Sequence, residues 1–292
     1  MENDQAKKLR NIASRLRKNR FEARKNKNIK RIAITSGKGG VGKSSFSLNL
    51  GLILSKMNKK VLLIDADINL GNIDILLGLV PQMTLRDIIS NDQPLERILI
   101  KAPGGLTIMP ASSGDLELLK KGSFVKDRIE KELAELELNY EYILIDTGAG
   151  IGEDVIDFAL NSDEVIVVTT SEPTAFTDAY ASIKTITSLK ERTNISVVIN
   201  MVSDEKEGKE IGEKLKIVAS HYLQKNIEYK GYIRRDANVT NAIRNQTPFF
   251  LLNDRTPASR DLWQIAMDII KSNKNSGENS DSETSMFRKI LN

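Results

Sequence analysis

The stretch that decides the fold reads Arg31-Ile-Ala-Ile-Thr-Ser-Gly37-Lys38-Gly39-Gly40-Val41-Gly42-Lys43-Ser44-Ser45. Its first residues are mostly aliphatic and predict a buried strand, and the residues from Gly42 onward predict the start of a helix. The glycines between them let backbone N–H groups curl around an anion without steric penalty. The helix start adds the positive end of its dipole. This order of elements predicts a phosphate-binding loop.

The loop also fits the P-loop pattern, which is a glycine, four arbitrary residues and then Gly-Lys-Ser/Thr. In that pattern Lys43 reaches the β- and γ-phosphates of a nucleotide, and Ser44 gives its hydroxyl to Mg²⁺. We therefore predict a site for ATP and Mg²⁺ formed by Gly37, Lys38, Gly39, Gly40, Val41, Gly42, Lys43, Ser44 and Ser45.

Composition excludes several other kinds of site. The 292 residues contain no cysteine, which excludes disulfides, Cys-ligated zinc and iron–sulfur clusters. The single histidine, His221, cannot build a His-based metal site or a Ser-His-Asp triad alone. No apolar run approaches the ~20 residues that a membrane-spanning helix needs, and the basic N-terminus lacks the apolar core of a secretory signal. We therefore expect a cytoplasmic protein.

Positive charge is concentrated at one end of the chain. Residues 1–31 carry twelve Lys/Arg against three acidic residues, a net charge of +9. The rest of the chain carries 31 basic and 36 acidic residues, a net charge of −5. A basic arm of this kind could meet nucleic acid, an anionic membrane or an acidic protein surface, or could simply be solvated.

The chain divides into four predicted parts. Residues 1–28 form a basic helical arm, 29–272 one α/β domain, 273–283 a flexible linker rich in Asn, Ser and charge, and 284–292 a short amphipathic helix. Aliphatic segments that alternate with helical stretches predict a mostly parallel sheet with helices on both faces. The predicted strands are 31–35, 60–64, 106–109, 142–145, 164–169, 196–200 and 228–233.

The form Lys38-Gly-Gly-x-Gly-Lys43-Ser resembles the deviant Walker A motif of the MinD/ParA ATPases. The resemblance implies a homodimer with ATP between two subunits, in which Lys38 reaches the partner subunit's nucleotide. It also implies a catalytic set of Lys38, Lys43 and Asp67. Hydrolysis is expected to be slow, because the sequence offers no obvious arginine finger in cis.

Two acidic segments resemble the switches of that family. Asp65 and Asp67 follow the predicted strand 60–64, and Asp146 ends the segment Tyr142-Ile-Leu-Ile-Asp146-Thr-Gly148. By that resemblance Asp67 positions the attacking water, and Asp65 and Asp146 join Ser44 around Mg²⁺. Gly148 is expected to move with the γ-phosphate.

The remaining nucleotide contacts are also implied by the resemblance. Asn200 ends a strand whose terminal Asn reads adenine in the family, and Glu172 lies in a loop that touches the partner's nucleotide. Asp236 aligns with a Gly-x-Ile-Pro-x-Asp loop that lines the base. Arg234 stands where that loop usually has proline.

The C-terminal residues resemble the membrane-targeting tail of MinD-type ATPases. Arg288 and Lys289 oppose one apolar helical face. Eight residues bind a membrane weakly, but two tails in one dimer bind much more strongly. The expected contacts with an anionic inner membrane in the ATP state are Met286, Phe287, Ile290 and Leu291.

The N-terminal segment Asp4-Gln5-Ala6-Lys-Lys-Leu9-Arg10 resembles the Asp-Gln-Ala-x-x-Leu-Arg motif of the FlhG (YlxH) family, MinD-like ATPases that control flagellar number and position. The resemblance implies that Asp4, Gln5, Ala6, Leu9 and Arg10 contact FlhF, a GTPase of the signal-recognition type, and stimulate its GTP hydrolysis. Flagellar switch components are further possible partners.

The sequence therefore predicts an ATP-switched regulator of flagellar placement and number that associates peripherally with the cytoplasmic membrane. No specific nucleic-acid partner is expected. One alternative is a MinD-type division-site regulator, which shares the tail but normally lacks the long arm. Another is a ParA-type DNA-partitioning ATPase, which would use the basic arm but has no need of an apolar C-terminal helix.

Overall fold

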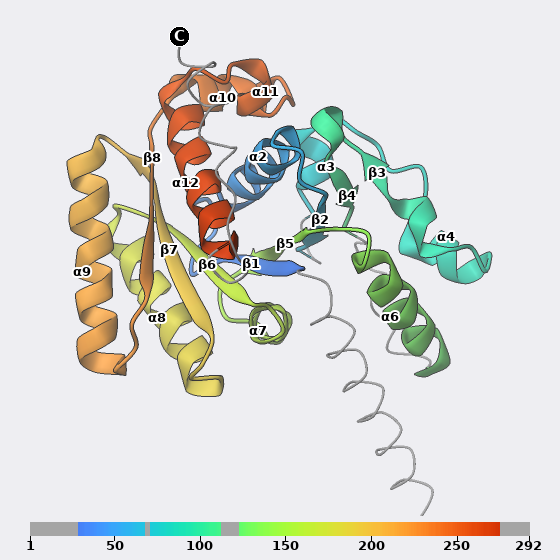
Figure 1. Cartoon of the computed structure of the whole chain (residues 1–292), viewed down its shortest axis with the longest axis horizontal. Coiled ribbons are helices and arrows are strands. Elements are labelled where there is room, and N and C mark those ends of the chain that lie inside the picture. The colour runs from blue at the N-terminus through green and yellow to red at the C-terminus, as the bar shows by residue number, and fades with distance from the viewer. Residues whose placement is uncertain (1–28, 68–70, 112–122, 275–292) are drawn as a thin grey trace, which may run out of the picture.

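The computed structural model describes residues 29–67, 71–111 and 123–274. Within these residues eight strands form one sheet in the order β3-β4-β2-β5-β1-β6-β7-β8 (Figure 1). All neighbouring strands are parallel except the edge pair β3 and β4. The strands are β1 Lys30–Ser36, β2 Val61–Ala66, β3 Ile100–Lys101, β4 Thr107–Met109, β5 Tyr142–Ala149, β6 Glu164–Thr170, β7 Asn194–Val202 and β8 Glu228–Arg234.

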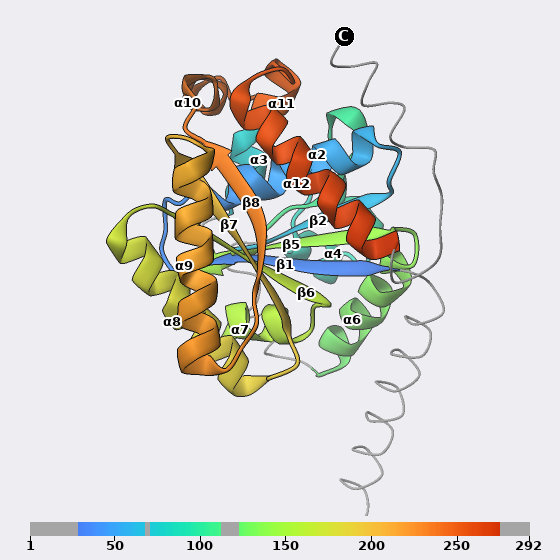
Figure 2. The ribbon, with the colours of Figure 1, turned by 60° about the vertical axis from the view of Figure 1, so that its left-hand side comes forward.

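Helices cover both faces of the sheet (Figures 1 and 2). The strands separate two layers because successive side chains point to opposite faces. In β1, Ile32 and Ile34 pack in the core cluster that contains α2 and α12 residues, whereas Ala33 packs in the cluster of α7, α8 and α9. The helices are α2 Lys43–Lys56, α3 Ile73–Leu76, α4 Leu85–Ser90, α6 Ser123–Glu137, α7 Glu153–Leu160, α8 Pro173–Leu189, α9 Glu205–Leu223, α10 Ala237–Arg244, α11 Phe249–Leu252 and α12 Pro257–Lys274, with 3-10 turns η1 Leu95–Ile98 and η2 Pro103–Gly105.

The predicted mostly parallel α/β fold is confirmed. Each of the seven aliphatic segments forms a strand. Strand β3 was not predicted, because two residues are too few to show the alternation of apolar and polar residues that marks a strand. The predicted arm at 1–28, most of the predicted linker and the predicted helix at 284–292 lie outside the described residues. Within the described ranges, no helix is long and apolar enough to cross a membrane.

The beginning and the end of the described domain lie side by side. Lys30 of β1 is in register with Tyr142 of β5, and the Tyr142 hydroxyl accepts a hydrogen bond of 3.2 Å from the Asn273 amide of α12. Figure 2 shows the end of α12 beside the start of β1. The first and last described residues therefore lie at one end of the sheet, where its central parallel strands begin.

The opposite edge of the sheet gathers the predicted nucleotide residues. Strands β2, β5 and β1 are adjacent, and Asp65 of β2 is in register with Asp146 of β5. The P-loop leaves the carboxyl end of β1, which pairs with β5 as far as Ala149. In parallel sheets ligands bind at this edge, so the topology alone brings the two predicted switches to the P-loop.

Candidate nucleotide site

The backbone of the P-loop needs its glycines. Gly40 and Gly42 have φ of 81° and 84°, a region that residues with a side chain rarely adopt. Gly42 is also the N-cap of α2. At Gly37 the reason is space, because a Cβ there would lie 2.2 Å from the Asp178 carbonyl of α8. The loop can therefore wrap an anion closely against the start of α2.

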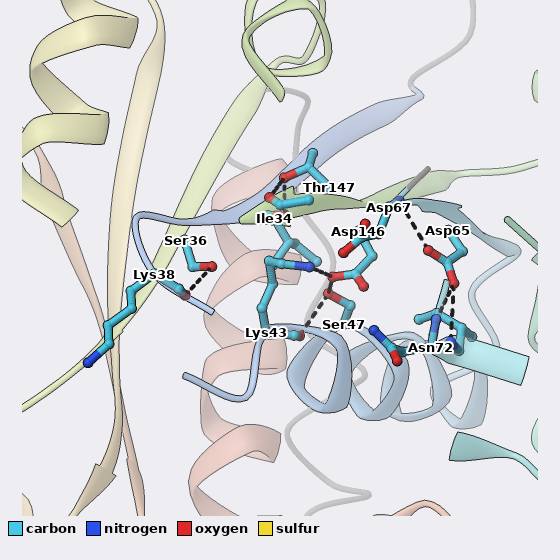
Figure 3. A network of polar contacts seen from close by, with 12 residues as sticks. Ile34, Ser36, Lys38, Lys43, Ser47, Asp65, Asp67, Asn72, Asp146 and Thr147 are labelled. Carbon is cyan, nitrogen blue, oxygen red and sulfur yellow. Dashed lines mark hydrogen bonds and ion pairs between the residues drawn. The ribbon is translucent and has the colours of Figure 1, made fainter. Parts of the chain in front are cut away.

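A buried ion pair forms the centre of the site (Figure 3). Lys43 Nζ lies 3.0 Å from Asp146 Oδ1, and the two side chains are 7% and 1% exposed. The Ser47 hydroxyl lies 2.7 Å from the same Oδ1 and 3.0 Å from the Lys43 carbonyl, and its single proton can serve either acceptor. Because burial removes solvent screening, this pair holds the P-loop lysine firmly against the end of β5.

Asp65 is a second buried carboxylate beside this pair. Its Oδ2 accepts hydrogen bonds from the Asn72 and Ile73 N–H groups at 3.0 and 3.1 Å, and its Oδ1 accepts one from the Asp67 N–H at 3.2 Å. Burial raises the pKa of the Asp65 carboxyl to about 6; the Ile73 N–H opposes the shift and the negative charge of Asp146 adds to it. The carboxyl therefore fixes the backbone at Asn72 and Ile73, and its pKa depends on the charge of Asp146.

Asp67 faces the second switch. A Cβ on Gly148 would lie 3.8 Å from Asp67 Oδ1. Figure 3 shows Asp65, Asp67 and Asp146 gathered on one side of Lys43. The structure thus brings both switch segments together at the P-loop. A role of Asp67 with water stays a prediction.

The cluster fits a divalent cation. Asp146 Oδ2 is buried and has no hydrogen-bond partner among the described residues, although Oδ1 has two. Asp65 brings a like charge close to it. Ser44 lies half-buried in the first turn of α2 with Ser45. Oxygen ligands of this kind suit Mg²⁺, so Ser44, Asp65 and Asp146 remain the candidate magnesium residues.

Lys38 points away from the buried ion pair (Figure 3). Its Nζ lies 3.1 Å from Glu172 Oε2 and 3.2 Å from the Thr174 hydroxyl. The Lys38 and Glu172 side chains are 42% and 66% exposed. The two residues predicted to reach a partner subunit are therefore on the surface and paired with each other.

The predicted base contacts are already engaged with the protein. Asn200 Nδ2 donates to the Val41 carbonyl at 2.8 Å, so this side chain supports the P-loop. Asp236 caps α10 through the Asn238 N–H at 2.9 Å and accepts from the Ala258 N–H of α12 at 3.2 Å. Contacts of Asn200 and Asp236 with a nucleotide base stay predictions.

Arg234, which stands at the position of a family proline, is held by α12. Its Nε and NH2 donate to the two Asp261 oxygens at 2.9 and 2.7 Å, and its backbone N–H donates to Oδ2 at 3.0 Å. A proline could make none of these bonds. The ion pair therefore fixes the end of β8 in place of a rigid ring.

Two contributors were not predicted from the sequence. Ser47 lies four residues after Lys43, one helical turn away on the same face, so helical spacing could have indicated it. Thr174 binds Lys38 only because α8 begins beside the P-loop, and no local signal indicates that contact.

Comparison with known proteins agrees with this geometry. A family model described as ParA, NUBPL iron-transfer P-loop NTPase, matches residues 27–270. The chain belongs to the ParA family of P-loop NTPases. It is therefore a P-loop ATPase. Iron transfer in that description belongs to a relative, and this sequence has no cysteine with which to ligate a cluster.

Three of the matched proteins are similar to this chain over most of their length. The chain is 36% identical to the antiactivator FleN of Pseudomonas aeruginosa over 82% of this chain and 85% of that protein. It is 35% identical to the flagellum site-determining protein YlxH of Helicobacter pylori over 92% and 89%. The MinD cell division protein of Aquifex aeolicus is 28% identical and superposes with a TM-score of 0.63 over 86% of this chain and 99% of that one. The chain is therefore MinD-like in fold.

Proposed function

We propose that this ATPase is an ATP-switched regulator of flagellar placement and number. The observation that carries the proposal is its similarity, over most of both chains, to one protein named an antiactivator and one named flagellum site-determining. The site supports the same reading, because its acidic residues lie on two separate segments beside one P-loop lysine. In such an arrangement, loss of the γ-phosphate can change the conformation of both segments.

ATP binding is proposed to break the Lys43–Asp146 pair. The phosphates compete for the Lys43 ammonium, and Asp146 is then released toward the magnesium position. Mg²⁺, when bound, neutralises phosphate charge and orients the phosphates. Asp67 is proposed to hold the attacking water, and Ser47 to keep Asp146 oriented throughout the cycle.

ATP is also proposed to join two copies of the chain. Lys38 is exposed, and among the described residues its ammonium is held by Glu172 and Thr174. Exposed ion pairs contribute at most about 1 kcal/mol, so Lys38 can leave this pair for the phosphates of a partner subunit. Hydrolysis then returns the chains to monomers.

We further propose that the dimer binds an anionic inner membrane through residues 284–292. The first and last described residues lie at one end of the sheet, since Asn273 bonds Tyr142 and Tyr142 is in register with Lys30. We propose that the tail and the basic arm act at the same membrane surface.

Sedimentation with anionic liposomes tests the membrane proposal. The full chain should pellet with ATP and Mg²⁺ and stay in solution with ADP. Phe287→Glu with Ile290→Glu should lower the pelleted fraction about tenfold or more, because the apolar face is lost. A control with Ser282→Glu and Asn292→Glu adds the same charge and should still pellet. If the Phe287→Glu, Ile290→Glu variant pelleted as well as the unmodified chain, the tail would have no role in membrane binding.

The arm is proposed to activate a GTPase of the FlhF type through Asp4, Gln5, Ala6, Leu9 and Arg10. A peptide of residues 1–28 should raise the GTP hydrolysis rate of such a GTPase. Leu9→Ala should abolish the stimulation, and Asn19→Ala in the same peptide should retain it. An unchanged rate with the unmodified peptide would refute this part of the proposal.

A further inference from the structure

Strand β7 contains an unusual backbone conformation beside the P-loop. Met201 has φ of 58°, in the left-handed region that side chains disfavour. Among the described residues, four other non-glycine residues have positive φ, and each lies at or just after the end of a helix, where this conformation is common. These four are Asn58, Asp92, Gln224 and Gln246. Met201 differs from them because it lies inside a strand.

The conformation of Met201 makes a bulge in the strand. Asn200 pairs with Ile233 of β8 and Val202 pairs with Arg234, so two steps along β7 match one step along β8. An extra residue of this kind bends a strand and re-aims its side chains. Beyond the bulge, the Arg235 N–H donates to the Val202 carbonyl at 2.7 Å, so backbone pairing resumes.

The bulge lets two consecutive side chains reach one P-loop residue. In a regular strand Asn200 and Met201 would point to opposite faces. Here a Cβ built on Gly42 would lie 2.4 Å from Asn200 Nδ2 and 3.4 Å from Met201 Cε. The Met201 N–H also donates to Asn200 Oδ1 at 2.9 Å, while Asn200 Nδ2 donates to the Val41 carbonyl at 2.8 Å.

We propose that Met201 is a positioning residue for the nucleotide site. Its left-handed backbone directs the Met201 N–H at the Asn200 amide, which in turn fixes the Val41 carbonyl and the Gly42 N-cap of α2. Strain in this conformation is retained because it aligns the phosphate-binding end of α2. The inference rests on the proposed function only in that the loop must bind a nucleotide.

Two substitutions separate the backbone from the side chain. Met201→Gly and Met201→Ala both remove the thioether, but only glycine adopts positive φ without strain. Alanine relieves its strain by flattening the bulge, which turns the Asn200 amide away from Val41. We expect Met201→Ala to bind Mg·ATP about fivefold more weakly than Met201→Gly, equivalent to about 1 kcal/mol, in equilibrium titration with a fluorescent ATP analogue.

The matched control makes the same exchange at Gln224, the C-cap of α9, whose φ is 50°. Gln224→Gly and Gln224→Ala should differ in unfolding free energy but bind the analogue equally. Equal affinities of the two Met201 variants would overturn the inference, as would an equal difference at Gln224. If the unmodified chain bound no nucleotide, the proposed function itself would fail.

Discussion

Replacing Lys43 with alanine should lower the ATP hydrolysis rate by about two orders of magnitude, the usual cost of removing one group that stabilises transition-state charge. Lys43 is the cation that the P-loop carries to the phosphates, and it already lies in the middle of the site, 3.0 Å from Asp146. Lys38 is not expected to replace it, because its side chain points away from the buried ion pair toward the surface (Figure 3). Phosphate release under saturating Mg·ATP measures the effect, and a rate within threefold of the unmodified chain would contradict it.

The same substitution should also destabilise the nucleotide-free protein. Asp146 would remain buried with the Ser47 hydroxyl as its one hydrogen-bond partner in the part of the chain that the structure describes, and breaking a buried pair on one side costs about 3–5 kcal/mol. Adding Asp146→Asn to Lys43→Ala removes the stranded charge, so part of the stability should return while hydrolysis stays low. Urea unfolding separates the two effects.

Lys56→Ala provides the matched control in the same helix. Lys56 pairs with Asp254 at 2.9 Å, and its side chain is 45% exposed. Such a pair contributes at most about 1 kcal/mol. Lys56→Ala should therefore leave hydrolysis unchanged and lower stability only slightly. A loss of activity comparable with that of Lys43→Ala would mean that losing a lysine anywhere in α2, and not the buried pair, lowers hydrolysis.

The fold could be predicted because its main signals are local. The stretch 31–45 contains a strand, a loop and a helix start within fifteen residues, and most of the aliphatic segments mark strands whose residues are largely buried. The positions of Asp65 and Asp146 followed as well, since residues that end neighbouring parallel strands meet at one edge of the sheet.

Other features of the site depend on contacts between distant segments, and the sequence does not encode these locally. Arg234 departs from the family proline, and the compensating Asp261 lies 27 residues away in α12. The pairing of Lys38 with Glu172 joins residues 134 positions apart. The positive φ of Met201 leaves no signal at all, because methionine is an ordinary strand residue whose backbone here is set by its neighbours in β8.

Replacing Asp67 with alanine should hold the protein in its ATP-bound form. If Asp67 positions the attacking water, its loss stops hydrolysis but leaves Lys43, Lys38 and the P-loop free to bind ATP. The Asp67 N–H that bonds Asp65 is a backbone group, and alanine keeps it. Asp74→Ala, an acid in the nearby helix α3, is the matched control and should cycle normally.

The mass of the Asp67→Ala chain in solution tests most directly whether Mg·ATP switches one chain into a pair. Light scattering should give twice the chain mass of 32.6 kDa with saturating Mg·ATP and the single mass with ADP. Lys43→Ala should give the single mass with either nucleotide. An Asp67→Ala protein that binds Mg·ATP and keeps the single mass would contradict the ATP-switched dimer.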